Sequence, residues 1–277
     1  MAMVKTRDGT HLYVKDWSLN GIRNRPVVLM HGWPLSADSW DDVALALVEQ
    51  GFWVIAYDRR GFGRSEQPFD GYDYDHLADD LYDVMEAYDL KDAAIAGFSM
   101  GGGEVARYMS RHQAKRVSKA VLVSAVVPYM LQTDDNPNGT PQAMFDQMLD
   151  GIKADRPKFF TDFFKDFYGV SMLSHPVTPE CLTWTQTMAM QASLRATLAC
   201  VKAFSSTDFR PDLAHFSVPT LIIHGAKDKT VPIEAAGRAA AAQLPQATFI
   251  EYEDAPHGLI ATHRARLIDD LLKFLWA

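Results

Sequence analysis

The pentapeptide GFSMG at 97–101 has the pattern G-x-S-x-G, in which the central Ser99 can act as a nucleophile. It stands where the apolar run 93–98 gives way to the helix-like segment 100–112, so we expect a sharp turn from a strand into a helix. Small residues two before and two after the serine relieve crowding in such a turn, and the strained backbone lifts the hydroxyl above the edge of the sheet. A glycine-rich turn that serves packing alone is the alternative, and the position after a buried strand argues against it.

A serine hydroxyl is a weak nucleophile unless a base takes its proton and a third group holds the base. Asp228 follows the strand-like run 219–225, and His257 follows the run 247–253. The carboxyl ends of parallel strands meet at one edge of a sheet, so we expect the three side chains to converge there. Taken singly, Asp228 also fits a turn residue and His257 a loop histidine bonded to a carbonyl. Together they predict Ser99 as nucleophile, His257 as general base and Asp228 as the acid that orients the base, in the chain order that the α/β-hydrolase fold uses.

Two backbone N–H groups are expected to bind the oxygen that gains charge during such a reaction. Trp33 follows the strand-like run 26–31 and Met100 follows the serine, so their N–H groups are the predicted oxyanion donors, each worth about 3 kcal/mol in comparable sites. Pro34 has no N–H and biases Trp33 towards an extended backbone, which predicts an effect on the choice of acyl acceptor. We assign Phe98 to the substrate pocket together with Pro34.

The other residues that could carry chemistry give weaker signals. His224 lies within a strand-like run, and we interpret it as a core residue or as one that supports the site from behind. The segment 58–65, DRRGFGRS, is basic and contains glycine but lacks the spacing of a phosphate-binding loop, which indicates a structural role. Cys181 and Cys200 give neither a disulfide framework nor a metal-ligand spacing, and no His, Cys or carboxylate cluster has the spacing of a metal site. We therefore expect no metal and no cofactor.

Strand-like and helix-like segments alternate along most of the chain. Short apolar runs rich in β-branched residues predict buried strands, and they are continuous rather than alternating, as parallel sheets require. The earlier segment 10–17 alternates apolar and polar residues and predicts a partly exposed edge strand of an antiparallel pair. The expected buried strands are 26–31, 52–57, 93–98, 119–125, 219–225 and 247–253, and the expected helices are 36–50, 73–90, 100–112, 234–243 and 263–276. This alternation predicts an α/β fold with a mostly parallel, doubly wound sheet.

The alternation fails in one long segment, 127–216, where turn residues are followed by helical stretches rich in Phe and Met. We interpret 127–216 as a helical cap inserted into an α/β core made of residues 1–126 and 217–277. The apolar residues of this segment exceed what a solvated helical hairpin needs. Most of them must therefore pack on one another or on the sheet, and a minority can face a ligand.

Composition and charge exclude several classes of function. With 277 residues, of which 48% are hydrophobic and 22% charged, the chain has the composition of a globular protein. Its net charge of -8 argues against nucleic acid as a partner, because binding to a polyanion needs clustered Lys and Arg. No apolar run approaches the roughly 20 residues that span a bilayer, which predicts no membrane partner. The start lacks the pattern of a signal peptide, so we expect a cytoplasmic location.

Nearly the whole chain resembles the cofactor-free (non-heme) haloperoxidase and arylesterase group of α/β-hydrolases. The resemblance rests on the strings HGWPLSADSW, DRRGFGRS, GFSMGGGEVARY, TDFRPDLAHFSVPTLIIHG and DAPHG. It implies a mostly parallel eight-stranded sheet flanked by helices, a helical cap over the site, esterase activity on small esters and, in many members, perhydrolysis of carboxylic acids by hydrogen peroxide. Members with proline at the position of Pro34 are those associated with stronger perhydrolysis. Lys227 and Lys229, on either side of Asp228, are less typical of the group.

The expected function is acyl transfer by a serine hydrolase. A small ester or carboxylic acid acylates Ser99, and water or hydrogen peroxide resolves the acyl-enzyme; in the second case the released peracid oxidises halide in solution without metal or haem. Lactone or amide substrates stay open because the same machinery opens them, as do a lyase and a hydrolase-like receptor that binds a ligand without turnover. A dehalogenase or epoxide hydrolase would need a carboxylate nucleophile at position 99, which the serine excludes. The sequence is compatible with a homo-oligomer.

Overall fold

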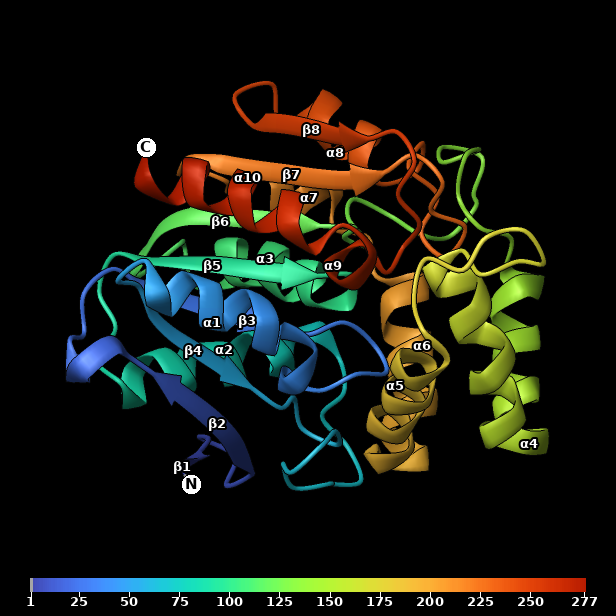
Figure 1. Ribbon diagram of the computed structural model, residues 1–277, viewed down its shortest axis with the longest axis horizontal. Helices are drawn as coiled ribbons and strands as arrows, with labels where there is room; N and C mark the ends of the chain where they lie inside the picture. The colour runs from blue at the N-terminus through green and yellow to red at the C-terminus, as the bar shows by residue number, and fades with distance from the viewer. Residues whose placement is uncertain (1) are drawn as a thin grey trace.

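The computed structural model describes residues 2–277, and its centre is an eight-stranded sheet (Figure 1). The strands are β1 (Ala2–Lys5), β2 (His11–Trp17), β3 (Pro26–Met30), β4 (Trp53–Tyr57), β5 (Ala93–Phe98), β6 (Val117–Val123), β7 (Thr220–Gly225) and β8 (Thr248–Tyr252). Their order in the sheet is β1-β2-β4-β3-β5-β6-β7-β8. β2 pairs antiparallel with β1 and β4, and all other neighbours are parallel. The predicted mostly parallel sheet is confirmed.

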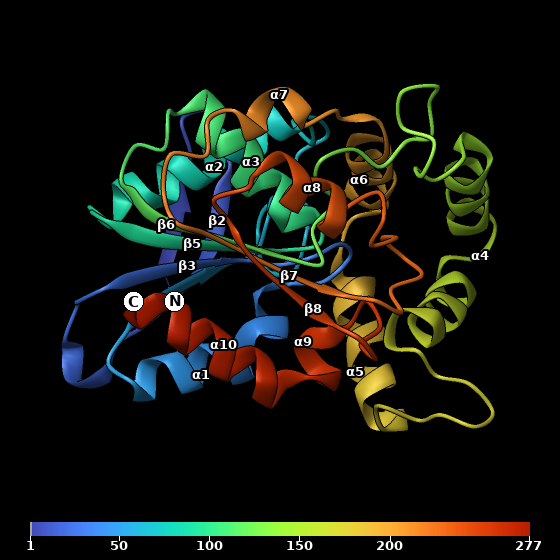
Figure 2. The same cartoon turned by 90° about the horizontal axis from the view of Figure 1, so that it is seen from above.

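Helices cover both faces of this sheet, which explains why its central strands have apolar side chains on both sides. Every residue of β4, β5 and β7 is buried. The helices are η1 (Leu19–Gly21), η2 (Ala37–Trp40), α1 (Asp41–Glu49), α2 (Tyr74–Ala87), α3 (Met100–Arg111), α4 (Gln142–Tyr168), α5 (Pro179–Gln191), α6 (Leu194–Ser206), α7 (Arg210–Leu213), α8 (Gly237–Gln243), α9 (Leu259–Thr262) and α10 (Arg264–Trp276). Figure 2 shows α1 and α10 on one face of the sheet and α2, α3, α7 and α8 on the other.

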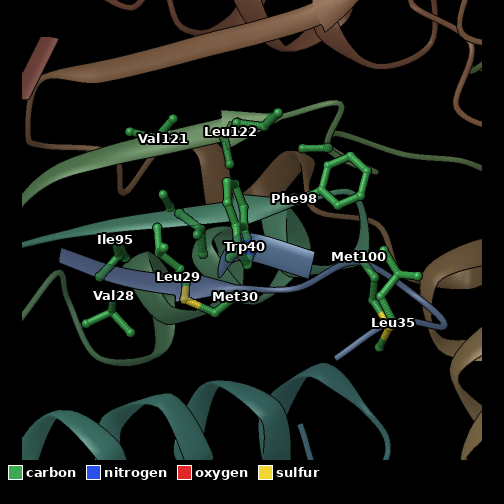
Figure 3. Packing of buried hydrophobic residues seen from close by; sticks show 14 of the residues in the cluster. Val28, Leu29, Met30, Leu35, Trp40, Ile95, Phe98, Met100, Val121 and Leu122 are labelled. Carbon is green, nitrogen blue, oxygen red and sulfur yellow. The ribbon is translucent and has the colours of Figure 1, made fainter. Parts of the chain in front are cut away.

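The core between the sheet and its helices is continuous with the residues beside Ser99. Val28 and Ile95, from neighbouring parallel strands, are paired in register and fully buried (Figure 3). Trp40, at the end of η2, is buried in the same cluster, and its ring meets the edge of Phe98 at a centroid distance of 6.3 Å. The turn after β5 is therefore built on close-packed side chains, which hold a backbone in one position.

Four helices, α4 to α7, follow β6 and precede β7. Figure 1 shows α4, α5 and α6 gathered beyond the ends of the strands that carry the arrowheads. α4 is bent rather than straight, because Asp155 has non-helical angles (φ -157°, ψ 88°) and Pro157 follows within the same helix. α7 differs from the other three, since it packs on α3 and the ring of Phe209, just before it, meets Tyr74 edge-on at 4.7 Å.

Candidate active site

Ser99 occupies the turn between β5 and α3 with a backbone that few residues other than glycine adopt. Its φ is 54° and its ψ is -117°. The strand and the helix come so close here that a side chain at Gly97 would collide with the backbone of Gly101, and a Cβ at Gly101 would lie 2.5 Å from the carbonyl oxygen of Met30. The two flanking glycines therefore allow the turn, and the turn brings the serine hydroxyl to the carboxyl edge of the sheet.

The structure brings Ser99, His257 and Asp228 together from three separate loops. His257 lies between β8 and α9, and its Nε2 is 2.9 Å from Ser99 Oγ. Its Nδ1 is 2.6 Å from Asp228 Oδ2, and Asp228 lies in the loop after β7. Only 5% of Ser99, 6% of Asp228 and 1% of His257 is exposed, so bulk water does not compete for these hydrogen bonds. This arrangement can move a proton from an alcohol to an imidazole.

The Asp228 carboxylate is held ionised by its neighbours. Its Oδ1 accepts hydrogen bonds from the N–H groups of Thr230 at 2.9 Å and Val231 at 2.7 Å. Burial alone would raise the pKa of Asp228, but the charge of His257 and hydrogen bonds from His224 and His257 outweigh it and lower the pKa to about 2. Because an ionised carboxylate only accepts hydrogen bonds, Nδ1 of His257 carries a proton and Nε2 is left free to accept the proton of Ser99.

Aromatic rings fix the imidazole of His257 from two sides. The ring of Phe98 lies 5.2 Å from it and that of Phe167, from α4, lies 4.9 Å away in an edge-on contact. Phe98 is fully buried and does not line the cavity above Ser99. Its assignment to the substrate pocket stays a prediction. Its ring packs on Trp40, Phe167 and His257.

The N–H groups of Trp33 and Met100 have no hydrogen-bond acceptor within residues 2–277. Met100 is the first residue of α3, where a helix leaves its N–H groups unpaired, and this end of a helix attracts negative charge. The loop that carries Trp33 touches the serine turn: a Cβ at Gly32 would lie 2.8 Å from the ring of Phe98 and 3.1 Å from Cβ of Ser99. The N–H of Met100, at the start of α3, and the loop that carries Trp33 thus both lie beside Ser99.

A buried ion pair, which the sequence pattern did not reveal, holds the loop before Trp33. Arg59 bonds to Glu104 of α3, and its guanidinium donates to the carbonyl oxygen of His31 at 2.6 Å. The backbone N–H of Arg59 donates to Nε2 of His31 at 2.9 Å. Burial and the nearby charge of Arg59 hold the pKa of His31 well below its usual value, so this imidazole is neutral. The spacing of the segment 58–65 predicts a structural role. Arg59, its first arginine, has such a role here, because it ties α3 to the loop before Trp33.

A narrow cavity lies above Ser99, with a free volume of about 30 Å³. Its lining is apolar except for the hydroxyls of Ser99 and Thr230, and it comes from both the sheet side and the helices α4 and α6. The lining residues are Trp33, Ser99, Val126, Met130, Phe145, Met148, Phe163, Phe204, Thr230 and Val231. Pro34, which follows Trp33 along the chain, is not among them, and its role in the choice of acyl acceptor stays a prediction. A wider groove of about 770 Å³, between residues 70–76 and α6, does not include Ser99.

No group of three or more His, Cys, Asp or Glu side chains within residues 2–277 is arranged to hold a metal ion. None of the helices described there is both long enough and apolar enough to cross a membrane.

Comparison with known proteins shows which family this chain belongs to. A family model described as alpha/beta hydrolase fold matches residues 25–263, and a non-heme chloroperoxidase of Streptomyces lividans is 44% identical over 277 residues, with 99% of each chain covered. This chain belongs to the non-heme haloperoxidase group of the α/β-hydrolase family. A bifunctional esterase/perhydrolase of Acinetobacter calcoaceticus is 41% identical to this α/β hydrolase over 278 residues, again with 99% of each chain covered. The predicted resemblance is confirmed.

A solved structure supports the same assignment at the level of the fold. The crystal structure of a bromoperoxidase from Bacillus anthracis matches this α/β hydrolase with a TM-score of 0.95 and 41% identity, over 100% of this chain and 99% of the other. The predicted fold class, with its eight-stranded sheet, is thus confirmed by the strand order and by the match.

Proposed function

We propose that this α/β hydrolase transfers acyl groups from small carboxylic esters, with Ser99 as nucleophile, His257 as general base and Asp228 as the acid that orients it. The observation that carries the proposal is the buried chain of contacts from Ser99 Oγ to His257 Nε2 and from His257 Nδ1 to Asp228 Oδ2, at 2.9 and 2.6 Å. A hydroxyl, an imidazole and an ionised carboxylate in this order make the alcohol reactive.

The reaction proceeds in two halves. His257 takes the proton of Ser99 as Oγ bonds to the ester carbonyl carbon, and the N–H groups of Trp33 and Met100 hold the oxygen that becomes negative. The C–O bond to the alcohol then breaks, and the imidazolium returns its proton to the leaving oxygen. In the second half His257 deprotonates water, which attacks the acyl-enzyme and releases the acid and free Ser99.

Hydrogen peroxide is proposed as a second acceptor in the second half. Its attack on the acyl carbon breaks the bond to Ser99 Oγ and releases a peracid, which oxidises halide in solution. The names of the relatives, a non-heme chloroperoxidase and an esterase/perhydrolase, support this activity. Pro34 follows the proposed oxyanion donor Trp33 and acts through that residue's backbone, since its own ring lies outside the cavity.

The segment 127–216 is proposed as a cap that limits the size of the acyl group. Phe145, Met148, Phe163 and Phe204, all from α4 and α6, close a cavity whose free volume is about 30 Å³. Residues 1–126 and 217–277 supply the sheet and the reacting side chains. The substrate is a small molecule; a cytoplasmic location and a homo-oligomer stay predictions from the sequence.

Substitution of the serine tests the nucleophile. Ser99→Ala is expected to abolish turnover of 4-nitrophenyl acetate and covalent labelling by a fluorophosphonate, because within residues 2–277 no other hydroxyl is bonded to His257 Nε2. Ser124→Ala is the control: this buried serine lies next to β6, and its hydroxyl has no partner in the described chain. Wild-type turnover by Ser99→Ala would remove Ser99 from the mechanism. Absence of any ester turnover in the wild type would favour a ligand-binding role.

Replacement of the proline tests the choice of acceptor. Pro34→Leu is expected to lower peroxide-dependent halogenation in acetate buffer relative to ester hydrolysis, since it frees the backbone on which Trp33 depends. Both rates are measured on the same preparation, so that a loss of folded protein lowers them equally. An unchanged ratio would show that Pro34 does not influence the acceptor.

A further inference from the structure

His224 is a buried histidine close to Asp228 for which the reaction described above has no use. It lies at the carboxyl end of β7, four residues before Asp228, and only 1% of it is exposed. Its Nε2 is 2.9 Å from the carbonyl oxygen of Val231 and 3.3 Å from Oδ2 of Asp228. One nitrogen thus faces two oxygens of the loop that carries the acid.

The partners of Nε2 determine which tautomer His224 adopts. A backbone carbonyl and an ionised carboxylate are both acceptors only, so Nε2 must carry the hydrogen. Of the two oxygens near Nε2, the carbonyl oxygen of Val231 is the closer and Oδ2 of Asp228 the more distant. A neutral imidazole suffices for both, so His224 needs no charge to act on the loop.

His224 acts on the carboxylate in two ways. It fixes the carbonyl of Val231, and the N–H of the same residue donates to Oδ1 of Asp228 at 2.7 Å. It also faces Oδ2, the oxygen that binds His257. The carboxylate thus has three hydrogen-bond donors, the N–H groups of Thr230 and Val231 and Nδ1 of His257, and Nε2 of His224 lies 3.3 Å away as a fourth neighbour. The orientation of this carboxylate decides where Nε2 of His257 points.

The imidazole of His224 is itself held in place by the start of α8. A Cβ at Gly237 would lie 2.7 Å from Cβ of His224 and 3.0 Å from its Nδ1. Any side chain at position 237 would therefore push the ring from its position. The absence of a side chain at Gly237 is a second, independent feature that the placement of this ring requires.

We propose that His224 is a positioning residue, which holds Asp228 in the orientation that binds His257. The inference rests on the proposed function of the site, and it differs from a role as core filler, for which any apolar side chain of similar volume would serve. Within the described chain the other charged groups nearby face solvent or one another. Lys227 and Lys229 are exposed, Glu251 of β8 pairs with Arg238 of α8, and Asp254 pairs with His263.

Two variants of similar size distinguish a positioning role of His224 from a role as core filler. His224→Gln keeps an N–H donor at a similar reach, whereas His224→Leu fills the space without one. His224→Leu is expected to lower kcat for 4-nitrophenyl acetate about tenfold with KM within about twofold of the wild type, because the bound state is intact and the base is misaligned. His224→Gln is expected to retain more than about half of kcat.

The pH profile gives a readout that a packing defect would not move. With one donor fewer, the Asp228 carboxylate attracts the proton of His257 more strongly, so the acid limb of kcat/KM moves about half a pH unit upward in His224→Leu and stays in place in His224→Gln. The NMR resonance of the proton on Nδ1 of His257 is expected to shift in His224→Leu and to stay unchanged in His224→Gln. This resonance is measured without turnover, so it tests His224 even if ester hydrolysis fails as the proposed function.

Each outcome decides the question. A wild-type profile and resonance in His224→Leu, or equal losses in both variants, would overturn the proposal and leave His224 as packing. If His224→Leu does not fold, Gly237→Ala carries the test, because it displaces the ring while keeping the histidine. Gly237→Ala is then expected to lower kcat and to move the acid limb in the same direction. An unmoved limb in folded Gly237→Ala would equally overturn the proposal.

Discussion

At the scale of single residues, Asp228 shows how a carboxylate keeps its charge in the interior of a protein. Burial opposes ionisation, yet two backbone N–H groups and two imidazoles face the two oxygens. These donors, together with the charge of His257, lower the pKa of Asp228 to about 2 despite its burial. The same contacts orient the carboxylate, so one set of bonds supplies both the charge and the geometry that His257 requires.

This low pKa predicts a pH-dependent contribution of Asp228 to stability. An unfolded aspartate has a pKa near 3.9, so the folded state favours the ionised form, which stabilises the fold by about 2 kcal/mol at pH above about 4. The contribution is lost as the pH falls from 4 towards 2. The free energy of unfolding of the wild type should therefore approach that of Asp228→Asn between pH 5 and pH 3, as measured by urea denaturation. A constant difference over this range would contradict the assigned pKa shift.

At the scale of elements, the turn from β5 into α3 depends on close approach of backbones. A Cβ at Gly101 would lie 2.5 Å from the carbonyl oxygen of Met30 in β3, which cannot rotate away as a side chain can. Gly101→Ala is therefore expected to destabilise the protein by about 1–3 kcal/mol and to lower activity further than the loss of folded protein explains. Thermal unfolding and kcat on the same samples measure the two effects.

A glycine within α4 gives the matched control for this prediction. A Cβ at Gly151 would approach only the ring of Phe159, which is a side chain that can move. Alanine also forms helix better than glycine by up to about 1 kcal/mol. Gly151→Ala should then be neutral or stabilising and fully active. Equal losses in both variants would show that backbone approach at the serine turn is not the cause.

The sequence predicted the elements of the sheet better than those between β6 and β7. The strand-like runs 93–98 and 219–225 match β5 and β7 to within a residue, because a strand buried on both faces must be apolar throughout. The expected helix 36–50 begins instead as the 3-10 turn η2, in which Ser36 accepts a hydrogen bond from Asp38. The bend of α4 at Asp155 was not predicted, although Pro157 is a local signal for an interrupted helix.

At the scale of the whole molecule, topology explains why the convergence of three polar side chains could be predicted and their surroundings only in part. Ser99, Asp228 and His257 each follow a parallel strand, and the carboxyl ends of such strands meet whatever the packing details are. His224 was recognised only as core or support, because its contacts depend on the path of the loop after β7. The contacts of Phe98 with Trp40 and Phe167 were not predicted, because nearness to the serine along the chain does not tell which distant rings a side chain meets.

Residues from the sheet side and from the helices after β6 together line the cavity above Ser99. Its size therefore depends on how these helices pack on the sheet. Trp33 and Val231 come from the sheet side, and Phe163 comes from α4. Phe163→Ala should open the cavity without touching the reacting residues. The ratio of kcat/KM for 4-nitrophenyl hexanoate to that for the acetate is then expected to rise about tenfold, since the space left by the ring would bury about two of the four added methylenes and each gains about 0.8 kcal/mol.

Phe159 offers a matched control for this substitution. Its ring stacks on that of Phe163 at 5.8 Å but does not line the cavity. Phe159→Ala therefore removes the same aromatic mass from α4 and should leave the ratio of the two esters within about twofold of the wild type. If both variants raise the ratio equally, a general loosening of the helices, rather than the wall contributed by Phe163, controls the length of the acyl chain. If neither does, the acyl group lies on another side of the cavity, and Met148 or Phe204 becomes the wall to substitute next.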